Sequence, residues 1–263
     1  MRNNPATLDG GTADPAPGAY DPRLVAAGAR PLADEHRVAL LFLDHMNPFE
    51  FAIACEVFGI RRGEVLAAMD EPRWYDLRVC AQHPGASIPT SFGFSLTVDR
   101  GLDALEDADT VIVPMGIKTP DAEQMACGWR MPGLPDDEVL DALRAAADNG
   151  ARMVSFCSGA FVLAEAGLLD GRRATTHWMY LDAFAARYPR VEVVHDVLWV
   201  DEGDRLTSAG SASGMDLSLH MVRTDHGADA ADLVARRTVV PPHRDGGQAQ
   251  YTTPPPVPTG GTT

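Results

Sequence analysis

One cysteine stands where a strand pattern changes directly into a helix pattern, and chemistry is most expected there. Residues 153–156 are apolar enough for a buried strand, and the chain continues from Cys157 with helical composition. Such a turn places its residue at the carboxyl edge of a sheet, above the first amides of the helix, as in a nucleophile elbow. Those amides favour a thiolate, and Gly159 permits close packing at the turn. Cys157 is therefore either a reactive thiol or a small buried core residue.

The other three cysteines are expected to be inert. Cys55 lies in a predicted helix, Cys80 ends a predicted strand, and Cys127 lies in the irregular stretch 125–130, which could line a pocket or form a dimer contact. The four spacings match neither a zinc ribbon nor a small disulfide framework. The chain has no His-x-x-x-His or Cys-x-x-Cys pair and no glycine-rich phosphate or dinucleotide motif. We therefore expect no metal and no cofactor.

Composition limits the classes of partner. The chain has 263 residues, 45% of them hydrophobic and 22% charged, which provides enough core for one large α/β domain. The net charge of −15 disfavours contact with nucleic acid and anionic membranes. The longest apolar runs, such as residues 38–43, are strand-sized rather than membrane-spanning. The N-terminus lacks the apolar segment of a secretory signal, so a cytoplasmic protein is expected.

Short apolar runs alternate with helical patterns through the middle of the chain. Asn47 and Pro48 predict a helix start, since Asn caps helices and Pro suits their first turn. Strands alternating with helices predict a doubly wound, mostly parallel sheet with helices on both faces. Strands are predicted at 38–43, 75–80, 110–114, 153–156, 191–194, 198–201 and 206–209, a hairpin at 87–98, and helices from 47, at 136–149, after 157, at 182–188 and within 214–240.

The two ends of the chain differ from the middle in composition. Residues 1–33 are rich in Gly, Ala, Pro and Asp without periodicity, which predicts a disordered leader. Residues 241–263 are rich in Pro, Gly and Thr, which is typical of a linker. One α/β domain is therefore expected at 36–240.

Several stretches resemble one protein superfamily. The run 157–178, which begins Cys-Ser-Gly-Ala-Phe and ends Thr-Thr-His-Trp, resembles the class I glutamine-amidotransferase-like superfamily that includes the PfpI proteases. Within it, the chain most resembles the N-terminal domain of GlxA/FtrA-type regulators of the AraC family. The stretches 47–59, 208–216 and 235–248 agree. The resemblance covers roughly residues 36–250 and implies a flavodoxin-like sandwich.

The resemblance also implies roles for single residues. Cys157 matches the elbow cysteine, Glu50 the acid that hydrogen-bonds it in many relatives, and His177 the histidine after the Thr-Thr pair. Gly116 and Ser158 stand where relatives supply the two amides of an oxyanion hole. A carboxyl and a histidine beside a thiol suit either a hydrolytic site or a redox sensor.

Three of these positions have structural alternatives. Asp216 lies in a block that resembles isonitrile-hydratase-like relatives, where it would contact a ligand, but it could instead be an acid in the first turn of a helix. Glu50 could be an exposed carboxylate at a helix start, and His177 could bond only to backbone near a strand end.

Departures from the enzymes of the superfamily favour a sensor. The proteases carry His directly after the nucleophile, where this chain has Ser158, and no C-terminal His and Glu partners of an amidotransferase triad are identified. The resemblance implies a ligand- or redox-sensing, dimerising domain of an AraC-family regulator. Such a domain binds a small-molecule effector in a homodimer and reaches DNA only through a helix-turn-helix domain, which is expected after the linker and is absent from this chain. The alternative is a cysteine-dependent lyase or hydrolase, such as an isonitrile-hydratase-like enzyme.

Overall fold

The centre of the protein is a six-stranded sheet in the order β2-β1-β5-β6-β10-β9. The computed structural model describes residues 35–67, 73–114 and 134–250. All neighbouring strands are parallel except β10 and β9, which are antiparallel. The predicted doubly wound, mostly parallel sheet is therefore confirmed. The strands are β1 (His36–Phe42), β2 (Tyr75–Ala81), β5 (Thr110–Val113), β6 (Arg152–Phe156), β9 (Trp199–Asp201) and β10 (Arg205–Ser208).

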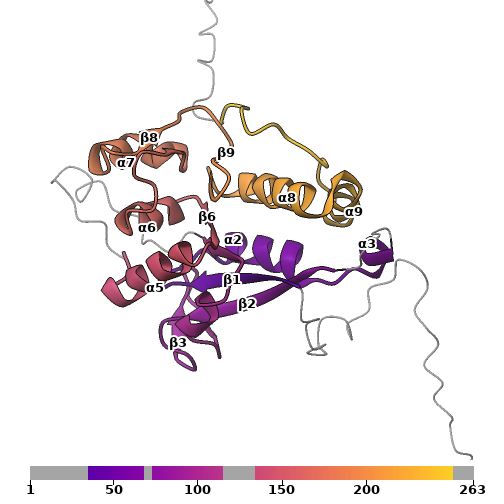
Figure 1. Ribbon diagram of the computed structural model, residues 1–263, viewed down its shortest axis with the longest axis horizontal. Coiled ribbons are helices and arrows are strands. Elements are labelled where there is room, and N and C mark those ends of the chain that lie inside the picture. The colour runs from indigo at the N-terminus through magenta and orange to yellow at the C-terminus, as the bar shows by residue number, and fades with distance from the viewer. Residues whose placement is uncertain (1–34, 68–72, 115–133, 251–263) are drawn as a thin grey trace, which may run out of the picture.

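Helices cover both faces of this sheet (Figure 1). In β1, Ala39 and Leu41 belong to one core cluster while Val38 and Leu40 belong to the other. All four side chains are fully buried, which explains why the strand is a continuous apolar run. One face is covered by η2 (Leu102–Leu105), α5 (Asp137–Asp148), α6 (Gly159–Glu165) and α7 (Leu181–Arg187), the other by α2 (Pro48–Ala54), η1 (Cys55–Gly59), α3 (Gly63–Ala67), α8 (Ala212–His226) and α9 (Ala228–Thr238).

Local signals explain several element boundaries. The Asn47 side chain accepts a hydrogen bond from the Phe49 amide at 3.0 Å, as predicted for the cap of α2. The predicted helical region 214–240 divides into α8 and α9 at Gly227, which has φ +90°. The predicted hairpin forms from β3 (Ser87–Pro89) and β4 (Ser95–Thr97). The predicted strand 191–194 instead pairs outside the main sheet, as β8 (Glu192–Val193) with the short β7 (Arg173–Ala174).

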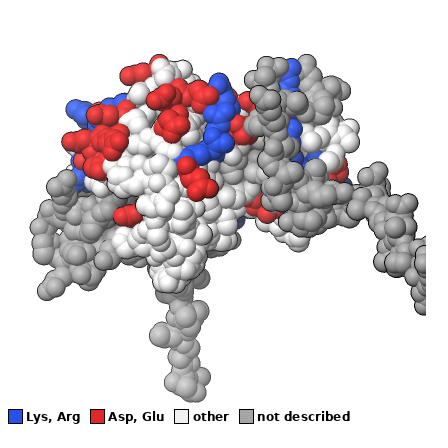
Figure 2. Space-filling model, turned by 90° about the horizontal axis from the view of Figure 1, so that it is seen from below, with Lys and Arg blue, Asp and Glu red and all other residues white. Residues whose placement is uncertain are grey.

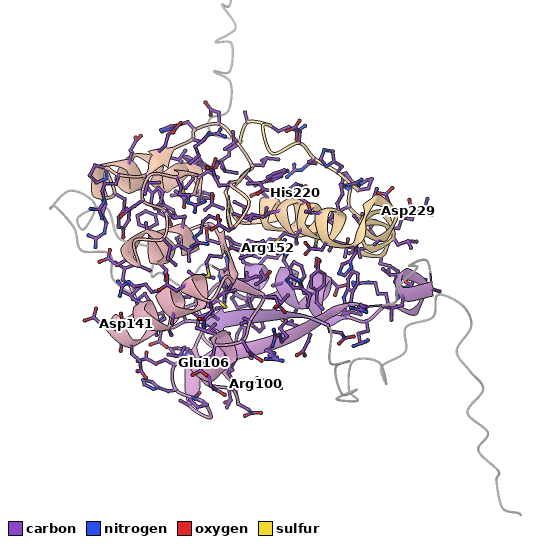
Figure 3. The ribbon with its side chains drawn as sticks, viewed as in Figure 1. Arg100, Glu106, Asp141, Arg152, His220 and Asp229 are labelled. Atoms are coloured by element: carbon purple, nitrogen blue, oxygen red, sulfur yellow. The ribbon has the colours of Figure 1, made fainter. Side chains whose placement is uncertain are left out.

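A polar cluster ties the end of α8 to the amino edge of the sheet. Arg152 donates two hydrogen bonds to the carboxylate of Asp225, at 2.8 and 2.6 Å, and Tyr75 donates a third at 2.7 Å. Arg152 and Tyr75 are the first residues of β6 and β2. Figure 3 shows Arg152 on the sheet side of α8 and His220 on its other side. With its C-terminal end fixed at this edge, α8 begins at the opposite, carboxyl edge, beside the end of β6.

The surface carries mixed rather than segregated charge on the face seen in Figure 2, where Arg lies beside Asp and Glu. Among the ion pairs of the described residues, Arg37 contacts Asp107 and Asp109, and Arg78 contacts Asp76 and Asp107. Among the described residues, no helix is long and apolar enough to cross a membrane.

Candidate functional site

Cys157 occupies a sharp turn between β6 and α6. Its φ is +50°, a left-handed conformation that costs a non-glycine residue of order 1–3 kcal/mol. Two hydrogen bonds hold this backbone: the Cys157 amide donates to the Ser208 carbonyl at 3.0 Å, and the Thr176 hydroxyl donates to the Cys157 carbonyl at 2.7 Å. The surrounding fold therefore maintains a strained residue at the carboxyl edge of the sheet.

Gly159 lets the turn pack against the neighbouring strand. A Cβ atom at this position would lie 2.0 Å from the carbonyl oxygen of Val113, the last residue of β5. No side chain fits in that space, so α6 begins in direct contact with the end of β5. The close packing predicted at Gly159 is confirmed.

Glu50 is fully buried beside Cys157, although it lies in the first turn of α2. Its carboxyl is hydrogen-bonded to the Cys157 thiol. Its Oε1 atom also accepts a hydrogen bond from the backbone amide of Ser211 at 2.7 Å. The resemblance therefore placed Glu50 correctly beside the cysteine, and the alternative of an exposed carboxylate at the helix start is wrong.

A short loop before α8 packs directly on these two side chains. Gly210 has φ +75°, and a Cβ atom there would lie 2.1 Å from Cβ of Cys157 and 2.7 Å from Oε1 of Glu50. Ser211, the next residue, has φ +49°. Glycine adopts a positive φ without strain, but Ser211 and Cys157 do not, so backbone strain is concentrated where the loop meets the cysteine.

The surroundings of Cys157 favour the neutral thiol. Burial raises the pKa of Cys157 well above its ordinary value, and the carboxylate of Glu50 raises it further. The backbone amide and hydroxyl of Ser158 act in the opposite direction but do not compensate. The amide at the start of α6 therefore lowers this pKa as expected, but burial and Glu50 outweigh it, because Cys157 is only 3% exposed and lies beside a carboxylate.

His177 is half-buried, and burial lowers its pKa. Its Nδ1 atom accepts a hydrogen bond from the amide of Met179 at 3.3 Å, which caps η3 (Trp178–Tyr180). His177 therefore makes a hydrogen bond to the backbone, which was the structural alternative to a role in the site. Besides capping η3, His177 also lines a cavity.

The cavity has a volume of about 210 Å³. This is smaller than the sites that hold drug-sized molecules, and it suits a small metabolite. Gly210 and Ser211 line it, so the loop that packs on Cys157 is also a wall of the cavity. The lining residues are His177, Trp178, Leu198, Ala209, Gly210, Ser211, Ala212, Ser213, Arg244 and Gln250.

Asp216 does not line this cavity but holds Arg244, a residue that does. Its carboxylate accepts hydrogen bonds from Nε and Nη2 of Arg244, at 2.8 and 2.5 Å, in a bidentate pair. Asp216 is 8% exposed and lies in the second turn of α8. Arg244, which does line the cavity, is therefore positioned by Asp216.

The remaining predicted residues have less definite positions. Ser158 is buried directly after Cys157, whereas Gly116, Cys127 and the stretch 125–130 lie outside the described residues. Burial raises the pKa of Cys55 to about 11 and that of Cys80 to about 12, which agrees with their being inert. Within the described parts of the chain, no group of three or more His, Cys, Asp or Glu residues could hold a metal ion.

Sequence reasoning assigned no role to the loop at Gly210 and Ser211 or to Arg244 and Gln250. The first pair lies in the stretch 208–216 and Arg244 in the stretch 235–248, both of which carried the resemblance. The available signal was therefore the resemblance of these blocks. Gln250 gave no signal of its own, because it lies in the proline-rich composition that predicts a linker.

Comparisons with known proteins show relatives in both sequence and fold. The regulator CdhR of Pseudomonas aeruginosa is 34% identical over 168 residues, which are 64% of this chain and 45% of that protein. The isonitrile hydratase of Pseudomonas putida is 37% identical over 106 residues, 39% of this chain and 44% of the enzyme. A solved AraC-family regulator from Pseudomonas putida has a TM-score of 0.62 at 21% identity, covering 77% of this chain and 99% of that one.

The named regulators among these relatives are longer proteins, and this chain spans about half the length of those it matches. The names of these relatives describe helix-turn-helix transcriptional regulators. The model of the DJ-1/PfpI family matches residues 36–224, the part of the chain that forms the sheet and both sides of the Cys157 turn. The chain therefore belongs to the DJ-1/PfpI family.

Proposed function

We propose that this chain is the effector-sensing domain of an AraC-family transcriptional regulator whose DNA-reading domain is a separate part of a longer protein. The observation that carries the proposal is the cavity of about 210 Å³ next to the Cys157 turn, two of whose walls, Arg244 and Gln250, come from the segment after the last helix. The names of the longer relatives support the regulatory part of the proposal. A cytoplasmic location belongs to the same proposal.

The state of Cys157 favours ligand binding over catalysis or oxidation. A cysteine nucleophile or redox sensor acts as the thiolate. Here burial and Glu50 raise the pKa of Cys157 and keep the neutral thiol. Glu50 meanwhile holds the backbone of Ser211, a wall of the cavity. In this arrangement Cys157 and Glu50 form the support of a binding site.

A thermal-shift screen tests the sensing role. Small metabolites are tested against the wild type and against Ala212→Trp, which places a large side chain at the exposed N-terminal end of α8 in the cavity wall. Ala145→Trp, at an exposed position of α5, is the matched control. The proposal expects compounds that raise the Tm of the wild type and the control but not that of Ala212→Trp. Compounds that act equally on all three proteins, or none at all, contradict it.

The homodimer is part of the same proposal, because two sensing domains would hold two DNA-reading domains in a fixed relation. Sedimentation equilibrium of the purified chain measures its mass directly. A mass twice the monomer's is expected at micromolar concentration, and a monomer at all concentrations overturns this part alone.

A hydratase is the second candidate, and the contact between Glu50 and the Cys157 thiol is the observation that favours it, since a carboxyl can move a proton to or from a thiol. The similarity to isonitrile hydratase covers a smaller part of the chain. Incubation with an alkyl isonitrile and detection of the N-substituted formamide separates the two functions. Turnover that is abolished in both Cys157→Ser and Glu50→Gln would establish the enzyme.

A further inference from the structure

The segment of residues 241–250, here called the strap, leaves the end of α9 and returns across α8 toward β9 (Figure 1). Its composition predicts a linker, yet Arg223 donates a hydrogen bond to its Pro242 carbonyl at 3.3 Å, and three further contacts fix it to the domain. The first is the bidentate pair of Arg244 with Asp216, in which the Asp216 side chain is 8% exposed. Because this carboxylate is nearly buried, losing Arg244 would leave a desolvated charge without its main counter-ion.

The second contact is made by a glycine. The Gly246 carbonyl accepts a hydrogen bond from the Leu198 amide at 2.7 Å. A Cβ atom at Gly246 would lie 2.6 Å from the indole ring of Trp199, so the strap backbone rests directly on that ring. The ring of His220, in α8, also stacks on Trp199, with ring centroids 4.1 Å apart. Only glycine allows the strap to lie this close to β9.

The third contact is made by Gln250, which is 7% exposed and uses both the oxygen and the nitrogen of its side-chain amide in hydrogen bonds. Its Oε1 accepts from the Trp178 amide at 2.8 Å, and its Nε2 donates to the carbonyls of Val197 at 2.9 Å and Thr176 at 3.2 Å. Gln250 thereby joins the chain on both sides of His177 to the start of β9. Arg244 and Gln250 also line the cavity, so two residues that anchor the strap form part of the cavity wall.

We propose that the strap is the gate of the cavity and that it opens and closes as one unit. A molecule in the cavity would touch Arg244 and Gln250, so its presence changes the free energy of strap opening. In longer proteins of this kind, the strap would pass cavity occupancy directly to the domain that follows. The inference rests on the proposed sensing function and names its regulatory element.

Two backbone amides outside the strap report its state without any effector. The amide of Leu198 donates to the middle of the strap, at Gly246, and the amide of Trp178 donates to its end, at Gln250. Hydrogen exchange followed by NMR is measured in the wild type, in Gln250→Ala and in Gln248→Ala, whose residue is exposed in the same strap. The proposal expects both amides to exchange about tenfold faster or more in Gln250→Ala, and neither to change in Gln248→Ala. The Met153 amide, bonded to the Asp204 carbonyl, controls for global unfolding.

A second pair of variants distinguishes movement of the whole strap from a local effect of the substitution at Gln250. Gly246→Ala forces the strap off Trp199, whereas Gly247→Ala meets only the side chain of Asp245 at 3.4 Å. Gly246→Ala is expected to release the Trp178 amide, at the far end of the strap, and Gly247→Ala is not. If each variant releases only the amide that it contacts, the strap does not move as a unit and the proposal fails.

Access to the cavity is measured by the reaction of His177 with diethyl pyrocarbonate, quantified by mass spectrometry. The gate predicts faster modification of His177 in Gln250→Ala and Gly246→Ala than in the two control variants, with His83 in an exposed loop reacting equally in all. Unchanged modification of His177 in a protein whose two reporter amides are released overturns the gate. Neither readout uses an effector, so this result and the outcome of the thermal-shift screen are independent.

Discussion

The backbone of Gly210 lies against the side chain of Cys157, so closely that a Cβ atom at residue 210 would be 2.1 Å from the Cβ of the cysteine. Because Gly210 also lines the cavity, the cysteine supports a wall of the binding site through this contact. The relationship ties the strained turn at Cys157 to the loop before α8, and it leads to a direct test.

Gly210→Ala is expected to lower the free energy of unfolding by about 2–4 kcal/mol, because the new methyl group collides with Cys157 and alanine is strained at φ +75°. Gly203→Ala is the control: its φ is +83°, but nothing lies within 4 Å of the added atom, so about 1 kcal/mol is expected. Urea denaturation measures both. Equal losses would show that the contact with Cys157 adds nothing.

Glu50→Gln is expected to make Cys157 more reactive. Removing the carboxylate charge removes one cause of the raised thiol pKa, while the amide oxygen can still accept from Ser211. Each unit of lowered pKa gives about tenfold faster alkylation below the pKa. Iodoacetamide labelling of Cys157 across pH, followed by mass spectrometry, measures the change.

The matched control for that experiment is Glu56→Gln. Glu56 helps to raise the pKa of Cys55, after burial, to about 11, so this variant should accelerate labelling of Cys55 and leave Cys157 unchanged. A Cys157 rate that is the same in Glu50→Gln as in the wild type would contradict the electrostatic role given to Glu50.

Asp225→Asn is expected to destabilise the protein by about 2–4 kcal/mol, since it leaves the largely buried Arg152 guanidinium without its counter-ion. Asp141→Asn removes the carboxylate of an exposed pair with Arg144 and should cost about 0.5 kcal/mol or less. Thermal and urea unfolding compare the two. A small effect at Asp225 would mean that α8 is held by its apolar face alone.

Stability is expected to fall as the pH drops below about 6.5. Burial lowers the pKa of His36 and His226 from their ordinary value of 6.5. The unfolded chain therefore takes up protons below this pH while the folded chain does not, and stability is lost until the lower folded pKa is reached. Asp225 acts in the same direction at lower pH: burial alone would raise its pKa, but Arg152 and Tyr75 hold it below the ordinary value.

Urea denaturation above and below pH 6.5 measures this dependence. His226→Phe keeps a ring between Trp74 and Tyr75 and should reduce the loss of stability on acidification. His83→Phe, in an exposed loop, should leave it unchanged. A pH dependence identical in all three proteins would exclude His226 as a contributor.

Local patterns were enough to predict the main sheet and the cap of α2. The continuous apolar run in β1 identifies a strand covered on both faces, and Asn47 with Pro48 identifies a helix start. The two-residue strand β7 could not be predicted, because it is defined by its pairing with β8 rather than by its own composition.

Sequence predicted some residues of the candidate site, but neither the rest of its cavity lining nor the direction of the thiol pKa shift. The resemblance placed Glu50 beside Cys157, yet the direction of the thiol pKa shift depends on how much water reaches the sulfur, which sequence does not show. Asp216 was placed in a ligand-contacting block, but its partner Arg244 is 28 residues away, in a segment whose composition indicates a linker. Contacts between distant segments decided both outcomes.

The strap also determines where a stable fragment of this protein can end. β9 is the strand at one edge of the sheet. The Gly246 carbonyl accepts hydrogen bonds from the amide of Leu198 at 2.7 Å and from the amide of Trp199, the first residue of β9, at 3.4 Å. Unpaired outer strands are templates for aggregation. A fragment cut at residue 240, the boundary that composition suggests, would expose the Trp199 ring together with these amides and is expected to self-associate, whereas a fragment that keeps Gln250 retains its own protection against aggregation.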